Sequence, residues 1–419
     1  FFKKINHNKN YKPFTLTKQY RMKNTVLNWK SNDGLAIFGQ KWENESTPAK
    51  AVICLVHGFG EHSSRYEHVA QFFTDHGYAV IAYDHRGHGR SGGRKGHFVS
   101  YDEFMNDVDN LIKQAELQFP SLPKILYGHS MGGNVVANYA ITAFPIMDIC
   151  QRNNIPLIVH FHGWTAYRKS LLVKHEEDYK RMFAIASAVI VVSKDMYEQL
   201  QKLGCPKEKL TIIYYGFNDE LFAYSDHSEN DSTFLSVGRF CDTKNPHLTI
   251  LAFHQVLQSL PAAKLNMIGG DENLLNSCIQ LVKSLKIEER VSFLGIKSPE
   301  EVASAMQKAI AFVQHSATTI EGEKEGTPVS IVEAMASGLP VVATRHAGIP
   351  DVIIENESGL LCNEFDLNEM AQLMLKIAND KALNQRIGKN ASDSVHHHFT
   401  MQQYIDKLWA VIDDKIQKQ

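Results

Sequence analysis

Short apolar runs alternate with longer amphipathic stretches along most of the chain, and this alternation constrains the fold more than any other feature. The runs are AVICLVHG (51–58), YAVIAYD (78–84), KILYGHS (124–130), PLIVHFHG (156–163), AVIVVS (188–193), TFLSVGR (233–239), AKLNMIGG (263–270), RVSFLG (290–295), AIAFVQHS (309–316) and PVVAT (340–344). Short buried strands separated by helices are typical of parallel sheets with helices on both faces. We therefore predict an α/β fold.

The size and charge of the chain limit what it can be. Its 419 residues, 44% of them hydrophobic, are enough for two or three domains with a core each. Lys and Arg number 44 against 46 Asp and Glu, so there is no basic excess and we expect no nucleic-acid partner. No run approaches the about 18 apolar residues of a membrane span, which leaves only peripheral membrane contact open. Because the chain begins with Phe1, it is compatible with a fragment or a processed product.

The cysteines and histidines do not predict a metal site. The six cysteines are scattered singly, without the close pairing of a zinc site or a small disulfide scaffold. We therefore expect reduced thiols, a cytoplasmic location and no metal. The run His396–His398 is interpreted as structural, because adjacent residues on a helix do not face one way.

Two segments suggest domain limits. The polar stretch AYSDHSENDST (223–233) lies between two strand signals and has the composition of a linker, which predicts a boundary near residue 228. After Phe399, the apolar residues Tyr404, Leu408, Val411 and Ile412 recur at helical spacing. This pattern predicts a terminal amphipathic helix over 401–419 that must pack on another element.

The N-terminal part carries a motif of serine hydrolases. Gly128-His129-Ser130-Met131-Gly132 follows an apolar strand and precedes a helical pattern, which is the setting that a G-x-S-x-G nucleophile turn requires. With HGFGEHS (57–63) and DHRGHGRS (84–91), residues of about 22–140 resemble the opening of an α/β-hydrolase of the monoacylglycerol lipase group. The resemblance implies Ser130 as nucleophile and the Phe59 and Met131 amides as oxyanion donors.

That hydrolase pattern stops early. The family places its catalytic Asp and His downstream of the serine, and no Asp or His after Ser130 lies in that context. A serine hydroxyl without a base is a weak nucleophile near neutral pH. We therefore interpret Ser130 mainly as a structural remnant, and a serine esterase acting on acyl glycerides stays an alternative.

From about residue 144 the sequence changes character. PLIVHFHGW (156–164), SVGRFCDTKNP (236–246), EGEKEGTPVSIVEAMASGLPVVATRHAGIPDVI (321–353) and ESGLL (357–361) resemble a family 4 glycosyltransferase with the GT-B fold. The resemblance implies two Rossmann-like domains, the first built in part from the hydrolase opening. The domains expected are 1–145 (truncated hydrolase-like), 146–227 (second half of the acceptor-side domain), 228–400 (nucleotide-sugar-binding domain) and 401–419 (terminal helix).

The donor site is expected where a loop opens a helix after residue 325. Free N–H groups and the positive end of the helix dipole at such a place receive phosphate or sugar oxygens, and Glu333 lies about two turns deeper than Glu325. The resemblance assigns Glu325 to the donor sugar and Glu333 to the ribose. It assigns Arg239 and Lys244 to the diphosphate, and it implies that no metal or cofactor is needed. The expected donor-binding residues are Arg239, Lys244, Glu325, Gly326, Thr327, Pro328, Val329 and Glu333.

On the acceptor side, His162 follows the strand PLIVHF and matches the histidine that the family places beside the anomeric carbon; the resemblance makes His162 and Glu325 the catalytic pair. We therefore expect a retaining transferase that moves a sugar from a nucleotide-sugar to a carbohydrate or lipid-linked acceptor. The family's N-terminal Gly-rich loop is missing, so a non-catalytic chimera is the remaining alternative. The two resemblances meet at about 140–146, where a sheet that continues across the seam is an option.

Overall fold

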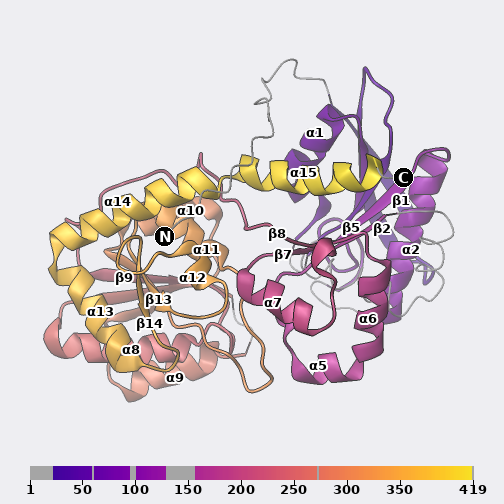
Figure 1. Cartoon of the computed structure of the whole chain (residues 1–419). Helices are drawn as coiled ribbons and strands as arrows, with labels where there is room; N and C mark the ends of the chain where they lie inside the picture. Colours follow the sequence, from indigo (N-terminus) through magenta and orange to yellow (C-terminus); the bar gives the residue numbers. More distant parts are fainter. Residues whose placement is uncertain (1–21, 59–60, 95–100, 129–155, 271–272, 418–419) are drawn as a thin grey trace.

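The structure is a computed structural model that describes residues 22–58, 61–94, 101–128, 156–270 and 273–417. It contains two sheets flanked by helices, arranged as two lobes (Figure 1). The α/β class predicted from the apolar runs is confirmed, and each of the ten runs contains a strand.

The first sheet is mixed and has the strand order β1-β2-β4-β3-β5-β6-β7-β8. Its strands are β1 (Met22–Lys30), β2 (Ala36–Asn44), β3 (Val52–Val56), β4 (Ala79–Tyr83), β5 (Lys124–Gly128), β6 (Leu157–His160), β7 (Ala188–Val191) and β8 (Leu210–Ile212). From β4 to β8 the neighbours pair in parallel, whereas β1 and β2 form an antiparallel hairpin that joins the edge at β4. The apolar-run pattern did not predict this hairpin, because β1 is largely exposed and alternates with polar residues.

Helices cover both faces of this sheet, since successive strand residues point to opposite sides. They are α1 (Glu67–Asp75), α2 (Tyr101–Gln118), α5 (Lys169–Lys174), α6 (Glu176–Ile185), α7 (Lys194–Lys202) and the short 3₁₀ turns η1 (Ser63–Tyr66), η2 (Trp164–Ala166) and η3 (Lys207–Lys209). Residues of α2, α6 and α7 share one apolar cluster with one face of the strands. Residues of α1 share a second cluster with the other face.

The sheet continues across the seam between the two sequence types. β5 belongs to the hydrolase-like part and β6 to the glycosyltransferase-like part, and they pair in parallel with Tyr127 opposite Ile158. The apolar faces also match: Leu126 and Leu157 lie in one buried cluster, while Tyr127 and Ile158 lie in the other. The two parts therefore form one sheet with a common core on each side.

The second sheet is parallel throughout its described pairs and has the order β11-β10-β9-β12-β13-β14. Its strands are β9 (Thr233–Val237), β10 (Lys264–Ile268), β11 (Val291–Phe293), β12 (Ala311–Gln314), β13 (Val341–Thr344) and β14 (Leu360–Cys362). Its helices are α8 (Pro246–Ser259), α9 (Leu275–Ser284), α10 (Pro299–Lys308), α11 (Val329–Ala336), α12 (Ile349–Val352), α13 (Leu367–Asn379) and α14 (Lys381–His398). Two apolar clusters, one on each face, hold the helices to the sheet.

The segments between and after the sheets are both packed. The polar stretch expected as a linker contains the buried His227, whose Nδ1 lies 3.1 Å from the Ala309 carbonyl oxygen of the second lobe. The chain then leaves α14 and forms α15 (Met401–Gln417), which returns to the first lobe and lies against it (Figure 1). The predicted limit at 145/146 lies outside the described residues, and the other domain limits stay predictions.

Candidate functional site

Glu325 lies at the centre of the candidate donor site. Its carboxylate accepts a hydrogen bond from Thr243 Oγ1 at 3.0 Å and lies 3.3 Å from Lys244 Nζ. Both charged side chains are mostly buried, with 13% of Glu325 and 14% of Lys244 exposed. The fold thus brings together two of the residues expected to bind the donor, from the segment after β9 and the loop before α11.

A buried histidine holds the backbone of the same loop. The Glu325 N–H donates to His346 Nε2 at 3.0 Å, so the hydrogen of this imidazole is on Nδ1, which lies 2.6 Å from the Glu364 carboxylate. Burial favours the neutral form of Glu325, but Lys244, Thr243 and His346 outweigh burial and lower its pKa. Glu325 is therefore a fixed, ionised carboxylate at neutral pH.

Two glycines allow the backbone to come close where β9 and β10 end. Gly269 has a φ of +157°, and a Cβ there would lie 1.8 Å from the Gly238 carbonyl oxygen. A Cβ on Gly238 would lie 2.5 Å from Lys244 Cδ. Arg239 and Lys244 line one small cavity together with Gly238. Two cations beside bare backbone at strand ends are suited to hold a diphosphate.

Helix α11 begins directly after the donor loop, with Pro328 at its N-cap and Val329 as its first residue. The side chain of Val329 is 38% exposed, whereas Thr327 is only 3% exposed. Thr327 Oγ1 donates to the Val192 carbonyl oxygen of the first lobe at 2.8 Å. The Thr327 hydroxyl hydrogen thus bonds to the opposite lobe.

Glu333 lies further along α11 and differs from Glu325 in its surroundings. Burial raises the pKa of its carboxyl group to about 7. A carboxylate that is buried away from water and has no cation beside it is suited to accept hydrogen bonds from neutral hydroxyl groups, such as those of a ribose.

His162 follows β6 and borders the donor loop from the first lobe. A Cβ on Gly326 would lie 2.6 Å from the His162 carbonyl oxygen, so the two backbones touch. His162 Nδ1 forms a short hydrogen bond with the Tyr215 hydroxyl group. The two predicted catalytic residues, His162 and Glu325, therefore flank the same Gly326 contact between the lobes.

Residues His57, Gly58 and Glu61 of the hydrolase-like part lie after β3, at the same sheet edge. His57 Nδ1 donates to the Gly58 carbonyl oxygen at 2.7 Å, and its Nε2 accepts from the His85 N–H at 2.9 Å. Burial lowers the pKa of His57 to about 4, so the ring is neutral. The Gly58 N–H donates to Glu61 at 3.0 Å. Phe59, Ser130 and Met131 lie outside the described residues, so the predicted nucleophile and oxyanion donors stay predictions.

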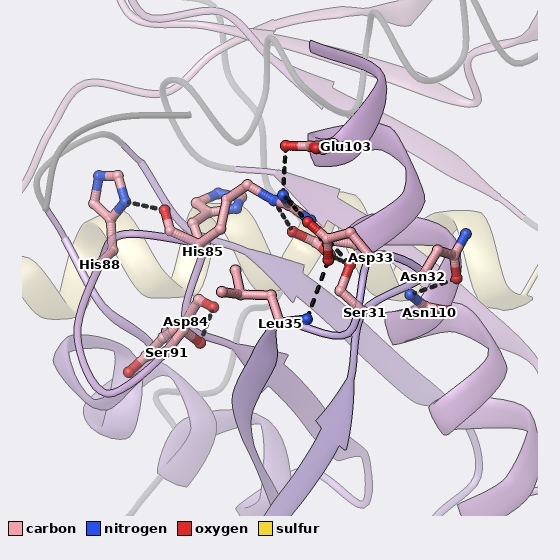
Figure 2. A network of polar contacts seen from close by, with 12 residues as sticks. Ser31, Asn32, Asp33, Leu35, Asp84, His85, His88, Ser91, Glu103 and Asn110 are labelled. Carbon is pink, nitrogen blue, oxygen red and sulfur yellow. Dashed lines mark hydrogen bonds and ion pairs between the residues drawn. The ribbon is translucent and has the colours of Figure 1, made fainter. Parts of the chain in front are cut away.

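The DHRGHGRS segment of that part has a structural role. Arg86 is buried and pairs with Asp33 at 2.9 Å, Glu103 at 2.6 Å and Asp107 at 2.7 Å. Figure 2 shows Ser31, Asp33 and Glu103 converging from the β1–β2 turn and α2 on this network. The Arg86 guanidinium group thus joins the β1–β2 turn to α2. Removing Arg86 would leave the buried Asp107 carboxylate without its cation.

Among the side chains that contact predicted site residues, Thr243, His346 and Tyr215 were not predicted, and neither was Glu364, which contacts His346. Thr243 lies within the predicted Arg239–Lys244 segment, and His346 directly follows strand β13, so the rule that α/β sites lie beyond the carboxyl ends of strands would have indicated both. Tyr215 follows the short strand β8, which the apolar runs did not reveal.

Among the described residues, no group of three His, Cys, Asp or Glu side chains is placed to hold a metal ion. In the same part of the chain, no helix has the length and apolarity needed to cross a membrane.

Comparison with known proteins separates the same two parts. Residues 47–148 match the family described as serine aminopeptidase, S33, and residues 217–394 match glycosyl transferases group 1. The amylovoran biosynthesis glycosyltransferase AmsK of Erwinia amylovora is 33% identical over 226 residues, which are 53% of this chain and 55% of AmsK. The monoacylglycerol lipase of Mycolicibacterium smegmatis is 45% identical over 106 residues, 25% of this chain and 38% of the lipase. The chain thus spans a little over half of this glycosyltransferase relative.

A solved structure supports the architecture. Anabaena HepE, in complex with UDP and glucose, aligns over 87% of this chain and 100% of its own with a TM-score of 0.65 and 17% sequence identity. At that identity the likeness shows the fold alone, and it confirms the predicted GT-B fold. The two family matches confirm the predicted two-part composition: within one GT-B fold, a segment similar to α/β-hydrolases precedes a region similar to group 1 glycosyltransferases.

Proposed function

We propose that the protein transfers a sugar from a nucleotide-sugar donor to an acceptor hydroxyl group with retention of the anomeric configuration. The observation that carries this proposal is the placement of Lys244 against Glu325, 3.3 Å apart, beside the touching backbones of Gly326 and His162. Two cations that can hold a diphosphate, Arg239 and Lys244, and the Glu325 carboxylate that can bind sugar hydroxyl groups then lie at one contact between the two lobes.

In the proposed reaction the acceptor oxygen bonds to the anomeric carbon on the face from which the diphosphate leaves. The bond between that carbon and the diphosphate oxygen breaks, and the acceptor proton passes to the leaving phosphate. Lys244 and Arg239 balance the charge of the departing diphosphate, which is electrostatic stabilisation without a metal. Lys244 pairs with Glu325 before the donor binds, so neither group is left buried and uncompensated.

Calorimetric titration tests the donor site. UDP is the first ligand to try, because HepE is described in complex with UDP, followed by GDP and the sugar conjugates of both. We expect saturable binding to the wild type and a loss of at least about tenfold in the combined Lys244→Ala and Glu333→Ala variant, which corresponds to about 1.4 kcal/mol. Lys264→Ala is the matched control, because Lys264 is exposed on β10 of the same domain.

The outcomes separate the alternatives. Nucleotide release with a product of unchanged anomeric configuration, read by proton NMR, would support retention, and an inverted product would overturn it. Binding without turnover of any donor, or no binding at all, would favour the non-catalytic chimera. The acceptor class, carbohydrate or lipid-linked, and a cytoplasmic location stay predictions.

A further inference from the structure

The side chain of Tyr215 contacts the imidazole of His162. β6, β7 and β8 pair side by side in parallel, and the Ile213 N–H extends the ladder to the Val191 carbonyl oxygen at 2.8 Å. His162 follows β6 and Tyr215 follows β8, so both leave the sheet at its carboxyl edge. Their rings are nearly parallel, with an interplanar angle of 18° and centroids 5.5 Å apart. The Tyr215 hydroxyl group forms a hydrogen bond with Nδ1 of the imidazole.

The phenol of Tyr215 remains neutral in these surroundings. Burial, then Tyr404, then the Glu325 and Glu61 carboxylates raise its pKa well above the ordinary value of 10.0. The hydroxyl hydrogen is therefore present at neutral pH. When this hydroxyl group donates to one imidazole nitrogen, that nitrogen carries no hydrogen, and the ring hydrogen of the neutral imidazole is on the other nitrogen.

We propose that Tyr215 is a positioning residue for glycosyl transfer: its hydroxyl group donates to Nδ1 of His162 and holds the imidazole, with its hydrogen on Nε2, beside the donor loop. This inference rests on the proposed transferase function. Close packing restrains His162. Its backbone lies so near Gly326 that a Cβ there would be 2.6 Å from the His162 carbonyl oxygen, and its ring centroid lies 4.0 Å from that of His160.

The hydrolase-like part adjoins this pair. The ring of Tyr404, on α15, stacks on His160 with centroids 6.5 Å apart, and its hydroxyl oxygen lies 3.4 Å from that of Tyr127 on β5. Glu61, from the loop after β3, acts on the pKa of both Tyr404 and Tyr215. A chain of contacts thus leads from His162 through His160 and Tyr404 to Tyr127 of the hydrolase-like part.

Tyr215→Phe removes the hydroxyl group and keeps the ring. Tyr197→Phe is the matched control: Tyr197 lies on α7 of the same lobe, is partly buried against the same apolar cluster as Tyr215, and does not touch His162 in the described contacts. We expect Tyr215→Phe to bind UDP within about twofold of the wild type and to lose about 10- to 100-fold in turnover number, since a displaced catalytic group affects the rate more than binding. Tyr197→Phe should retain the wild-type turnover.

Nitrogen-15 NMR of histidine-labelled protein, with His162 assigned through His162→Gln, gives a readout that does not depend on activity. We expect the wild type to show the Nε2–H tautomer at His162 and Tyr215→Phe to show a mixture. An Nδ1–H tautomer in the wild type, or an unchanged tautomer in Tyr215→Phe, would overturn the inference even if transfer is observed. Absence of transfer with the expected tautomer shift would instead overturn the proposed function and leave the Tyr215 contact standing.

Discussion

Glu325, in the loop before α11, and Glu333, on α11 itself, show how the surroundings of a residue set its charge. Glu325 lies beside Lys244, Thr243 and His346, which outweigh burial and lower its pKa. Burial raises the pKa of the Glu333 carboxyl group to about 7. The first carboxylate is therefore ionised before any ligand binds, whereas the second is close to half protonated at neutral pH. Their roles in donor binding stay predictions, but their chemistry already differs.

The raised pKa of Glu333 predicts a pH-dependent stability. The unfolded chain loses this proton near pH 4.5 and the folded chain only near pH 7, so the free energy of unfolding falls as pH rises through this window. Glu333→Gln should therefore raise the melting temperature at pH 8.5, by the equivalent of about 1–3 kcal/mol, and hardly change it at pH 4.

Thermal unfolding without nucleotide, followed by circular dichroism at both pH values, measures the effect. Glu357→Gln serves as control because Glu357 is exposed. An equal shift at both pH values would show that Glu333 is not desolvated in the folded protein.

At the scale of the element, α15 is the helix that connects the two lobes. It follows α14 of the second lobe but packs on the first, where Leu408 and Ile412 are buried in the cluster formed by β3, β4 and β5. The Trp409 ring contacts Phe72, Phe73, His76 and Tyr78 on and after α1. The apolar face of the predicted amphipathic helix thus packs on the hydrolase-like part.

Truncating the buried face of α15 should destabilise the first lobe. Leu408 is 1% exposed, and Leu408→Ala removes apolar contacts and leaves a cavity, which typically costs about 2–5 kcal/mol. Urea unfolding monitored by tryptophan fluorescence measures the loss. Lys407→Ala, on the exposed side of the same turn, should cost less than about 0.5 kcal/mol. Equal stability of both variants would mean that α15 does not pack on this sheet in solution.

At the scale of the whole molecule, the donor loop is the contact between the lobes. Thr327 bonds to the Val192 carbonyl oxygen at 2.8 Å, and Lys324 pairs with Asp195 at 2.8 Å. The Lys194 N–H donates to Asp351 at 2.7 Å. Lys324 and Thr327 lie on either side of Glu325 in the donor loop, so the loop expected to bind the donor also holds the lobes together. Donor binding is therefore linked to the relative position of the lobes.

A methyl group at Gly326 should separate the lobes. It would lie 2.6 Å from both the His162 carbonyl oxygen and the side-chain atom Val192 Cγ2, so the His162 backbone and the Val192 side chain would both have to move. We expect Gly326→Ala to keep the secondary structure, to increase the radius of gyration in small-angle scattering and to weaken nucleotide binding by about tenfold or more.

Gly270→Ala is the matched control, because its Cβ would contact only the exposed side chain of Ile296, at 3.2 Å. A scattering curve for Gly326→Ala that coincides with that of the wild type would show that the close contact is absent in solution.

The sequence alone determined the ten strands within the apolar runs, the fold class and the two-part composition. Each apolar run became a strand, because a short buried strand needs little beyond its own hydrophobic residues and flanking turns. Tertiary structure decided which strands meet: the antiparallel hairpin, the β5–β6 pairing across the seam, and the Tyr215–His162 contact. It also directed the Thr327 hydroxyl group to the opposite lobe. These features depend on pairs of residues far apart in the chain, whose energies arise only when the sheet has brought them together.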